Sequence, residues 1–328
     1  MKQARALLPM LGLAAALAQA AGDPAADTAP GGPTAVAAPQ ATQPALETAR
    51  AQARSLSERI AREVDQWFGD LPFEAGGKVS DGRASVGVFH RRDQGSDVDV
   101  RFTARFRLPN VERSAYLFIG RDQPGAVVRN TPQSASNKQR LLTNSQPGDR
   151  SFLGGFGLSL RDDFNFRVGV GARLQPFVQV RYDKPWTFGP GQTLSLRETV
   201  FWTPDDRLGS TTALSYDLAL QPQLALRWLS AATITQASRN VEWHSSLGTY
   251  RSFGDQRLMS LELLFSGTQA RGTGVGLSDR GVLAKWEQPL YKDWLLGEVM
   301  LGHFWLRPDS LSPRGRAWAL GAYLKMDF

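Results

Sequence analysis

The sequence contains no cysteine among its 328 residues. This absence excludes a disulfide framework and a thiol for lipid attachment, so we expect neither a disulfide-stapled fold nor a lipoprotein. Histidine is scarce as well: only His90, His244 and His303 are present, and without cysteine they spell out no transition-metal site. We therefore predict that the protein binds no metal ion and no other cofactor.

Long hydrophobic runs are also lacking, apart from one run at the start. Lys2 and Arg5 precede an apolar stretch from Ala6 to Ala18, which ends in an Ala-Gln-Ala sequence. This run is shorter than the ~20 residues of a spanning helix, and its pattern is typical of a secretory signal peptide. We expect residues 1–20 to be cleaved during export, so any later membrane residence must use β-strands, whose alternation hides their hydrophobicity from an averaged score.

A strong excess of charge of one sign is missing too. The formal net charge is +7, and it falls to +5 when Lys2 and Arg5 leave with the signal peptide. This charge is modest for the length of the chain, and an exported protein rarely meets nucleic acid. We therefore expect no nucleic-acid partner.

Two segments precede the main domain. Residues 21–45 are rich in Ala, Pro, Gly and Thr and hold almost no large apolar residue, which predicts a flexible tether. Residues 46–70 instead show helical periodicity, with one apolar stripe made by Leu56, Ile60, Val64, Trp67 and Phe68. We expect an amphipathic helix that packs on the periplasmic end of the domain, and the alternatives are docking of a periplasmic partner through residues 46–68 or plugging of a lumen.

From residue 83 onward, segments of roughly 8–13 residues alternate apolar with polar side chains between short turns. The clearest segment has Val98, Val100 and Phe102 on one face and Asp97, Asp99 and Arg101 on the other. The predicted strands are 83–92, 96–108, 114–121, 150–161, 164–174, 176–183, 192–203, 210–220, 223–235, 239–252, 256–267, 278–289, 293–306 and 315–328. We therefore predict residues 83–328 to be an all-β domain of about 14 strands, with 12 as the alternative.

Alternation alone does not separate a membrane barrel from a soluble β-sandwich, but three further features favour the barrel. The strand that contains Leu295 and Trp305 is long enough to cross the apolar band of an outer membrane. Aromatic residues gather near predicted strand ends: Trp186, Phe188, Tyr291 and Trp294 near one edge, and Trp202, Trp305 and Trp318 near the other. The last strand ends on Met326 and Phe328, the kind of terminal signal that the barrel-assembly machinery reads, although Tyr323 stands where the common form has glycine. We predict a transmembrane antiparallel β-barrel in the outer membrane of a Gram-negative cell.

Four short stretches carry a resemblance to known sequences: Asp65-Gln66-Trp67-Phe68-Gly69-Asp70, Arg107-Leu108-Pro109-Asn110, Gly120-Arg121-Asp122 and Lys292-Asp293-Trp294-Leu295-Leu296. In these stretches the chain resembles a family of uncharacterised proteobacterial outer-membrane proteins. The resemblance covers most of the chain thinly. It implies export and a barrel, and it supplies no activity, substrate or catalytic residue.

If the apolar rows face lipid, the opposite rows line the lumen and sort by charge. The early strands contribute Arg101, Arg105, Arg107, Arg167, Arg173, Arg181, Arg197 and Arg227. The later strands contribute Asp217, Glu242, His244, Glu262, Glu287 and Glu298. We expect these two groups to meet across the interior or where the first and last strands join.

Two functions are consistent with such a lumen. Separated charges that line a pore orient small polar or anionic solutes, which predicts a small-solute channel or passive transporter. A cross-lumen network of paired charges would instead hold a closed structural barrel whose helix docks a periplasmic partner. We favour the channel, with outer-membrane lipid and lipopolysaccharide around it.

Enzymatic chemistry has one candidate, the stretch Glu242, His244, Ser245 and Ser246, which resembles part of an outer-membrane phospholipase. A strand spaces same-face side chains ~6–7 Å apart, too far for a hydrogen-bonded relay. Lumen-facing residues are also on the wrong side of the wall for cleaving membrane lipid. We expect no enzymatic activity.

Two polar segments remain. Asp97 and Asp99 are too few to hold calcium, so we expect a solvated strand end. Residues 122–149, with the basic residues Arg129, Lys138 and Arg140, are expected to form a surface loop on the outer side, with contact to lipopolysaccharide phosphates as the alternative.

Overall fold

The computed structural model describes residues 42–65, 78–93, 95–107, 115–122, 127–129, 151–160, 163–171, 174–254, 256–270, 276–307 and 315–328. In this part of the chain, α2 (Thr42–Asp65) is followed by fourteen strands. The strands are β1 (Lys78–Arg91), β2 (Gly95–Arg107), β3 (Ala115–Asp122), β4 (Ser151–Leu160), β5 (Phe164–Val170), β6 (Pro176–Gly189), β7 (Gln192–Thr203), β8 (Arg207–Gln221), β9 (Leu224–Thr235), β10 (Val241–Phe253), β11 (Arg257–Gln269), β12 (Asp279–Tyr291), β13 (Leu295–Leu306) and β14 (Gly315–Asp327). The predicted signal peptide lies outside the described residues.

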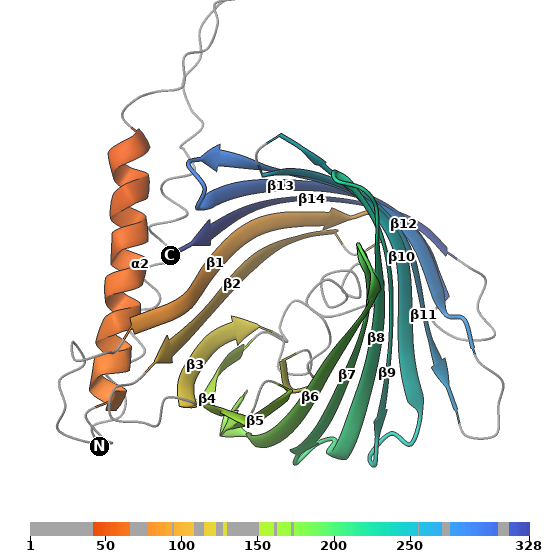
Figure 1. Cartoon of the computed structure of the whole chain (residues 1–328), viewed down its shortest axis with the longest axis horizontal. Helices are drawn as coiled ribbons and strands as arrows, with labels where there is room; N and C mark the ends of the chain where they lie inside the picture. The colour runs from red at the N-terminus through yellow and green to blue at the C-terminus, as the bar shows by residue number, and fades with distance from the viewer. Residues whose placement is uncertain are drawn as a thin grey trace, which may run out of the picture.

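The strands form a closed antiparallel barrel, in which each strand pairs with its sequence neighbours (Figure 1). The barrel closes where β1 pairs with β14, in a register that places Ala84 opposite Met326. We call this pairing the seam. The prediction of a fourteen-stranded antiparallel barrel is confirmed.

Some strand ends differ from the prediction. β5 ends at Val170 instead of residue 174, because Leu174 has a φ of 60° and reverses the chain. β6 continues to Gly189 instead of residue 183, since its pairing with β7 runs through Pro185. The run Asp183-Lys184-Pro185 breaks the apolar alternation, so the extra length of β6 gave no signal in the sequence.

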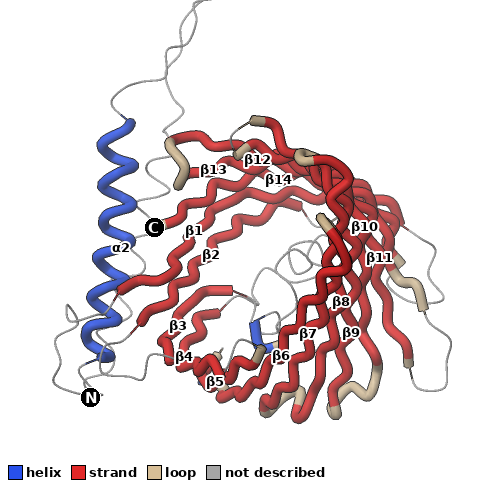
Figure 2. Tube along the Cα trace, viewed as in Figure 1, coloured by secondary structure: helices blue, strands red, loops and turns tan. Residues whose placement is uncertain are grey.

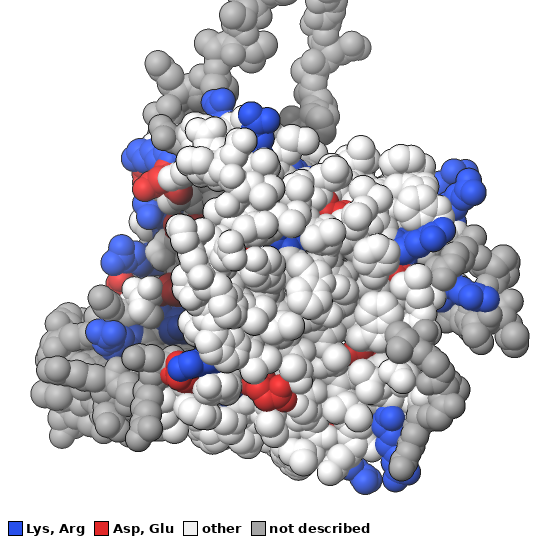
Figure 3. Space-filling model, turned by 45° about the vertical axis from the view of Figure 1, so that its right-hand side comes forward, with Lys and Arg blue, Asp and Glu red and all other residues white. Residues whose placement is uncertain are grey.

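The outer wall of the barrel is predominantly apolar. Val98, Leu301 and Leu320 are 59%, 50% and 55% exposed. Large apolar side chains that are exposed in rows like these are unfavourable in contact with water. Figure 3 shows a broad uncharged face of this wall, with Lys, Arg, Asp and Glu side chains gathered mainly at its margins. Strand alternation turns the opposite row of each strand into the lumen.

The helix α2 lies outside the barrel, against the wall near the ends of β1, β2 and β14 (Figure 1). Its small residues Ala53, Ser57 and Ala61 are buried, which lets the helix approach the wall closely. Ala61 packs with Phe106 of β2 and Leu117 of β3, both on the outer face. Ala53 packs on the seam side, in a cluster that contains Ala84, Leu295 and Met326.

This position argues against a plug of the lumen, while docking of a periplasmic partner through residues 46–68 stays a prediction. Its buried face is occupied by the chain's own barrel wall, and not by the lumen. The helix also begins at Thr42, so the last residues of the predicted tether are helical, with Pro44 in the first turn where it is tolerated. The predicted stripe residues Trp67 and Phe68 lie outside the described residues. No helix in the described part of the chain is long and apolar enough to cross a membrane.

A polar contact fastens the start of α2 to the turn after β12. Glu47 accepts hydrogen bonds from Lys292 and from the Tyr291 hydroxyl, the latter at 3.2 Å. The hydrogen bond from Lys292 lowers the pKa of Glu47, and the reciprocal bond raises the pKa of Lys292. Both groups therefore carry their charges over the whole neutral range.

The sequence placed Trp294 in an exposed aromatic girdle, but the structure does not. Trp294 is 3% exposed, because it packs in the cluster under α2. The Arg50 guanidinium lies 4.9 Å from the centre of its ring. The exposed residues Trp186, Phe188, Trp202 and Trp318 do remain on the outer wall.

Candidate functional site: the charged lumen

The pairing register places the predicted charged residues on the lumen side of the wall. Arg181 is opposite Thr199, Arg197 is opposite Ala213, and Asp217 is opposite Arg227, all on the face away from the exposed apolar rows. The same alternation holds for Arg101, Arg105, Arg107, Arg167, Glu242, His244, Glu262, Glu287 and Glu298. Arg173 lies outside the described residues.

Large aromatic side chains in the lumen cover glycines of neighbouring strands. A methyl group added at Gly157 would overlap the ring of Tyr116, and one added at Gly281 or Gly302 would overlap Phe304. Phe201 covers Gly209 in the same way. These rings lie against the wall, so they take less of the cross-section than rings that point to the barrel axis would.

On one side of the lumen, Tyr116 organises two arginines. Its hydroxyl donates a hydrogen bond to Asn165 at 2.8 Å and accepts one from Arg167 Nε at 2.9 Å. The Arg105 guanidinium lies 4.5 Å from the centre of the same ring. Within the described part of the chain, neither Arg105 nor Arg167 forms an ion pair with a carboxylate. Their positive charges are therefore uncompensated there.

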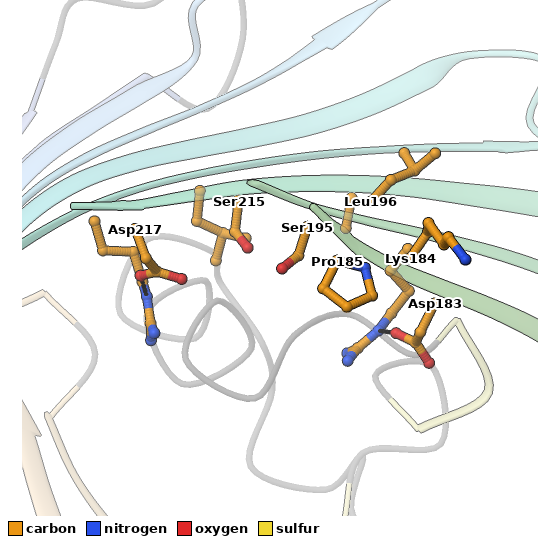
Figure 4. Close-up of a pocket in the computed structure, with 11 residues that line it drawn as sticks. Asp183, Lys184, Pro185, Ser195, Leu196, Ser215 and Asp217 are labelled. Carbon is orange, nitrogen blue, oxygen red and sulfur yellow. Dashed lines mark hydrogen bonds and ion pairs between the residues drawn. The ribbon is translucent and has the colours of Figure 1, made fainter. Parts of the chain in front are cut away.

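Strands β6 to β9 carry a mixed cluster of acidic and basic side chains. Asp183 pairs with Arg181 and with Arg197, each at 2.5 Å, and Asp217 pairs with Arg227. A cavity of about 390 Å³ is bordered by Asp183, Arg197, Asp217 and Arg227, together with Ser195, Ser215 and Leu229. Figure 4 shows Asp183 and Asp217 at the two ends of this cavity, each joined to its arginine by a dashed line.

The acidic side of the lumen is neutralised by lysines. Lys325 pairs with Glu287 at 2.5 Å and with Glu298 at 2.9 Å. Lys285 lies 3.8 Å from Glu262, which is fully buried. The sequence places Lys325 on the inward row of the last strand and predicts contact with the basic first strands at the seam, whereas the structure pairs it with acidic residues of β12 and β13. The inward position of Lys285 was not recognised from the sequence.

The sequence predicts that the basic and the acidic residues pair across the interior of the barrel or at the seam. The pairs described above lie along the wall instead. The pairs between strands described above join residues on adjacent or next-but-one strands of the same stretch of wall, because side chains on hydrogen-bonded strands are about 5 Å apart and long side chains reach one strand further. At the seam, Arg83 pairs with Asp327 at 2.6 Å. Asp99 is also not a solvated strand end: it is 1% exposed and pairs with Arg101 at 2.8 Å.

The connection between β3 and β4 does not run only over the outer surface. Its residues 127–129 fold into the barrel, where Gln179 of β6 donates a hydrogen bond to the Val128 carbonyl at 2.6 Å. Val128 is buried against three lumen-facing rings, those of Phe118, Phe177 and Phe201. Figure 2 shows this short helical piece in blue, within the barrel outline beside β6. The interpretation of residues 122–149 as a plain surface loop is wrong for this segment, while Lys138 and Arg140 lie outside the described residues.

Arg129 anchors this inner segment at two points. It donates to Asp206, in the turn after β7, at 2.8 Å, and to Glu242 of β10 at 2.9 Å. Burial acts to lower the pKa of Arg129, but the hydrogen bonds and negative charges of Asp206 and Glu242 together outweigh burial and raise that pKa. No sequence pattern predicted this contact, since it depends on a loop that turns inward.

The stretch that resembles part of a phospholipase is divided between the two faces of the wall. Ser245 faces outward and accepts a hydrogen bond from the Trp228 indole at 3.1 Å, whereas His244 and Ser246 face the lumen. Glu242 binds Arg129. Among the described residues, no group of three metal-binding side chains is arranged to hold an ion.

No protein-family model matches the chain, and no curated protein matches it. Solved structures of barrels are similar at low identity. A loop-deletion mutant of OmpT, an outer membrane protein of Vibrio cholerae, is 11% identical, with a TM-score of 0.46, over 77% of this chain and 99% of that chain. The outer membrane channel DcaP of Acinetobacter baumannii is 12% identical, with a TM-score of 0.46, over 78% of this chain and 98% of that chain. The KdgM porin is 9% identical, with a TM-score of 0.36, over 75% and 99%.

Proposed function

We propose that this protein is an outer-membrane channel that passes small anionic solutes. The membrane location is supported by the predicted signal peptide and by the apolar outer wall. Strands such as β13, with 12 residues, are long enough to cross the apolar band of an outer membrane, about 25 Å tall, at a tilt of ~40°. In this arrangement the C-terminus and α2 are on the periplasmic side.

The observation that carries the anion preference is the imbalance of charge in the lumen. Arg105 and Arg167 have no carboxylate partner in the described part of the chain, whereas Glu262, Glu287 and Glu298 lie beside lysines. An anion that enters a narrow lumen loses part of its hydration shell, and uncompensated guanidinium groups can take the place of the lost water molecules. Low-dielectric walls increase the effect, because they focus the field of the arginines into the lumen.

The cavity between Asp183 and Asp217 supplies the next step of the path. Its arginines are partly neutralised by these carboxylates, so an anion is held there less strongly than beside Arg105 and Arg167. Conduction requires sites that bind weakly enough to release the solute. A strong site next to weaker ones meets this requirement.

The proposal is tested by single-channel recording in planar bilayers across a salt gradient. We expect wild type to show discrete conductance steps and a reversal potential on the anion-selective side. Arg105→Gln and Arg167→Gln should each lower the anion-to-cation permeability ratio. Arg251→Gln is the matched control, because Arg251 lies on the outer wall beside Phe253 and loses the same charge.

Two results would contradict the proposal. Correctly folded protein without conductance steps would remove the channel function altogether. A ratio that falls equally in Arg251→Gln would show that total charge, and not the lumen arginines, sets the selectivity.

A further inference from the structure

A cationic and aromatic patch lies on the outer wall at the end of the barrel opposite α2. Strand pairing aligns Arg280 of β12, Trp305 of β13 and Arg316 of β14 in one row across three adjacent strands. Arg280 and Arg316 are exposed. The Arg280 guanidinium lies 5.4 Å from the centre of the Trp305 ring, which holds it at the wall.

The row below adds a second aromatic layer. His303 is paired with Trp318, and the His303 ring centre lies 4.3 Å from that of Trp318 and 4.5 Å from that of Trp305. The His303 Nδ1 atom is buried and has no hydrogen-bond partner among the described residues. Trp318 is 53% exposed, so the patch has an open aromatic face.

The two arginines lack the partners that exposed arginines usually find. In the described part of the chain, neither Arg280 nor Arg316 lies within ion-pair distance of a carboxylate. They are separated by two strand spacings, about 10 Å, with Trp305 between them. Two free guanidinium groups at this spacing form a receptor for a group with several anionic oxygens, because each planar fork binds phosphate with two hydrogen bonds.

The wall next to the patch is apolar. Leu301 of β13 and Leu320 of β14 are paired with each other, two residues further into the barrel, and both are about half exposed. The patch therefore combines a site for anionic oxygens at the rim with an apolar surface directly below it. A membrane lipid has these two parts in the same order, whereas a soluble anion has only the first.

We propose that Arg280 and Arg316 bind the phosphate groups of a phosphorylated glycolipid in the outer leaflet, with its acyl chains on Leu301 and Leu320. This proposal rests on the proposed location in the outer membrane, because only then is the rim at headgroup level. Aromatic residues of membrane barrels concentrate at that level, as Trp305 and Trp318 do here.

The test measures lipid binding directly, without any readout of conductance. Native mass spectrometry of the folded, detergent-solubilised full chain is titrated with diphosphorylated lipid A and, separately, with the same lipid after dephosphorylation. We expect the phosphorylated lipid to bind, and the double variant Arg280→Gln/Arg316→Gln to bind it at least about tenfold more weakly, since it loses the charge-assisted hydrogen bonds of both guanidinium groups.

The matched control is Arg251→Gln/Arg257→Gln, which removes two exposed arginines from the outer wall near the other end of the barrel. Equal weakening in the control would overturn the proposal, because bulk charge would then explain binding. Equal affinity for the dephosphorylated lipid would overturn the phosphate assignment. Displacement of the lipid by millimolar inorganic phosphate would assign the patch to free phosphate and overturn the lipid. A chain that binds lipid here without conducting ions would contradict the channel alone.

Discussion

At the scale of single residues, glycines on the lumen wall make room for aromatic rings. The clearest case is Gly157 of β4, where the ring of Tyr116 takes the space that a Cβ atom would occupy. Tyr116 in turn holds Asn165 and Arg167 by hydrogen bonds. A glycine on one strand thus fixes the position of an arginine on the next.

We predict that Gly157→Ala destabilises the barrel by about 1–3 kcal/mol, because the added methyl group forces Tyr116 away from its partners. Urea unfolding in lipid vesicles, followed by tryptophan fluorescence, measures this change. Gly189→Ala is the control, since no atom lies within 4 Å of its added Cβ. An equal effect of both substitutions would mean that the Tyr116 contact is unimportant for stability.

At the scale of elements, α2 crosses the seam on the outside of the barrel. It contacts β1, β13 and β14 through Ala53, and β2 and β3 through Ala61. The terminal residue lies in the same region: the Phe328 ring stacks on Phe102 of β2 with centroids 5.9 Å apart. Since this surface needs strands from both ends of the chain, α2 has a complete docking site only after the barrel has closed.

We predict that Ala61→Glu releases α2 from the wall, because a carboxylate buried against Phe106 and Leu117 has no cationic partner in that cluster. Tryptic cleavage after Arg59, followed by mass spectrometry, should accelerate roughly tenfold or more while the barrel stays folded. Ala51→Glu, on the exposed face of the same helix, should leave the cleavage rate unchanged. Protection of Arg59 in the Ala61→Glu variant would argue against the packing described.

At the scale of the whole molecule, the inner segment 127–129 joins parts of the wall that are far apart in the sequence. Arg129 connects it to the turn after β7 and to β10. The segment occupies lumen cross-section and stays in place through these ion pairs and the packing of Val128. The free width of the lumen is therefore set by a loop as well as by the strand count.

We predict that Arg129→Gln raises single-channel conductance and increases current fluctuations. The variant loses two charge-assisted contacts of about 1.5–3 kcal/mol each, so the segment leaves the wall more often. Recordings in planar bilayers at fixed voltage, beside wild type, test this directly. Identical conductance and noise in the two proteins would show that the segment does not limit the path.

The sequence alone was enough to predict the barrel, to favour 14 strands over 12, and to assign a face to most strand residues. These features follow from a local period of two, which is visible in a row such as Val98, Val100 and Phe102 without knowledge of any partner strand. The end of β6 escaped this reasoning, because Pro185 and its neighbours interrupt the alternation while pairing with β7 continues.

The ion-pair partners of the lumen charges, and the positions of α2 and of residues 127–129, became clear from the three-dimensional structure alone. Lys325 neutralises Glu287 and Glu298 because strand pairing places β12, β13 and β14 side by side in the sheet. The inward turn at Arg129 and the docking of α2 over the seam depend on surfaces built from distant strands. Alternation along the sequence shows which face of a strand a side chain occupies. Its partner on another strand is set only when the strands pair in the sheet.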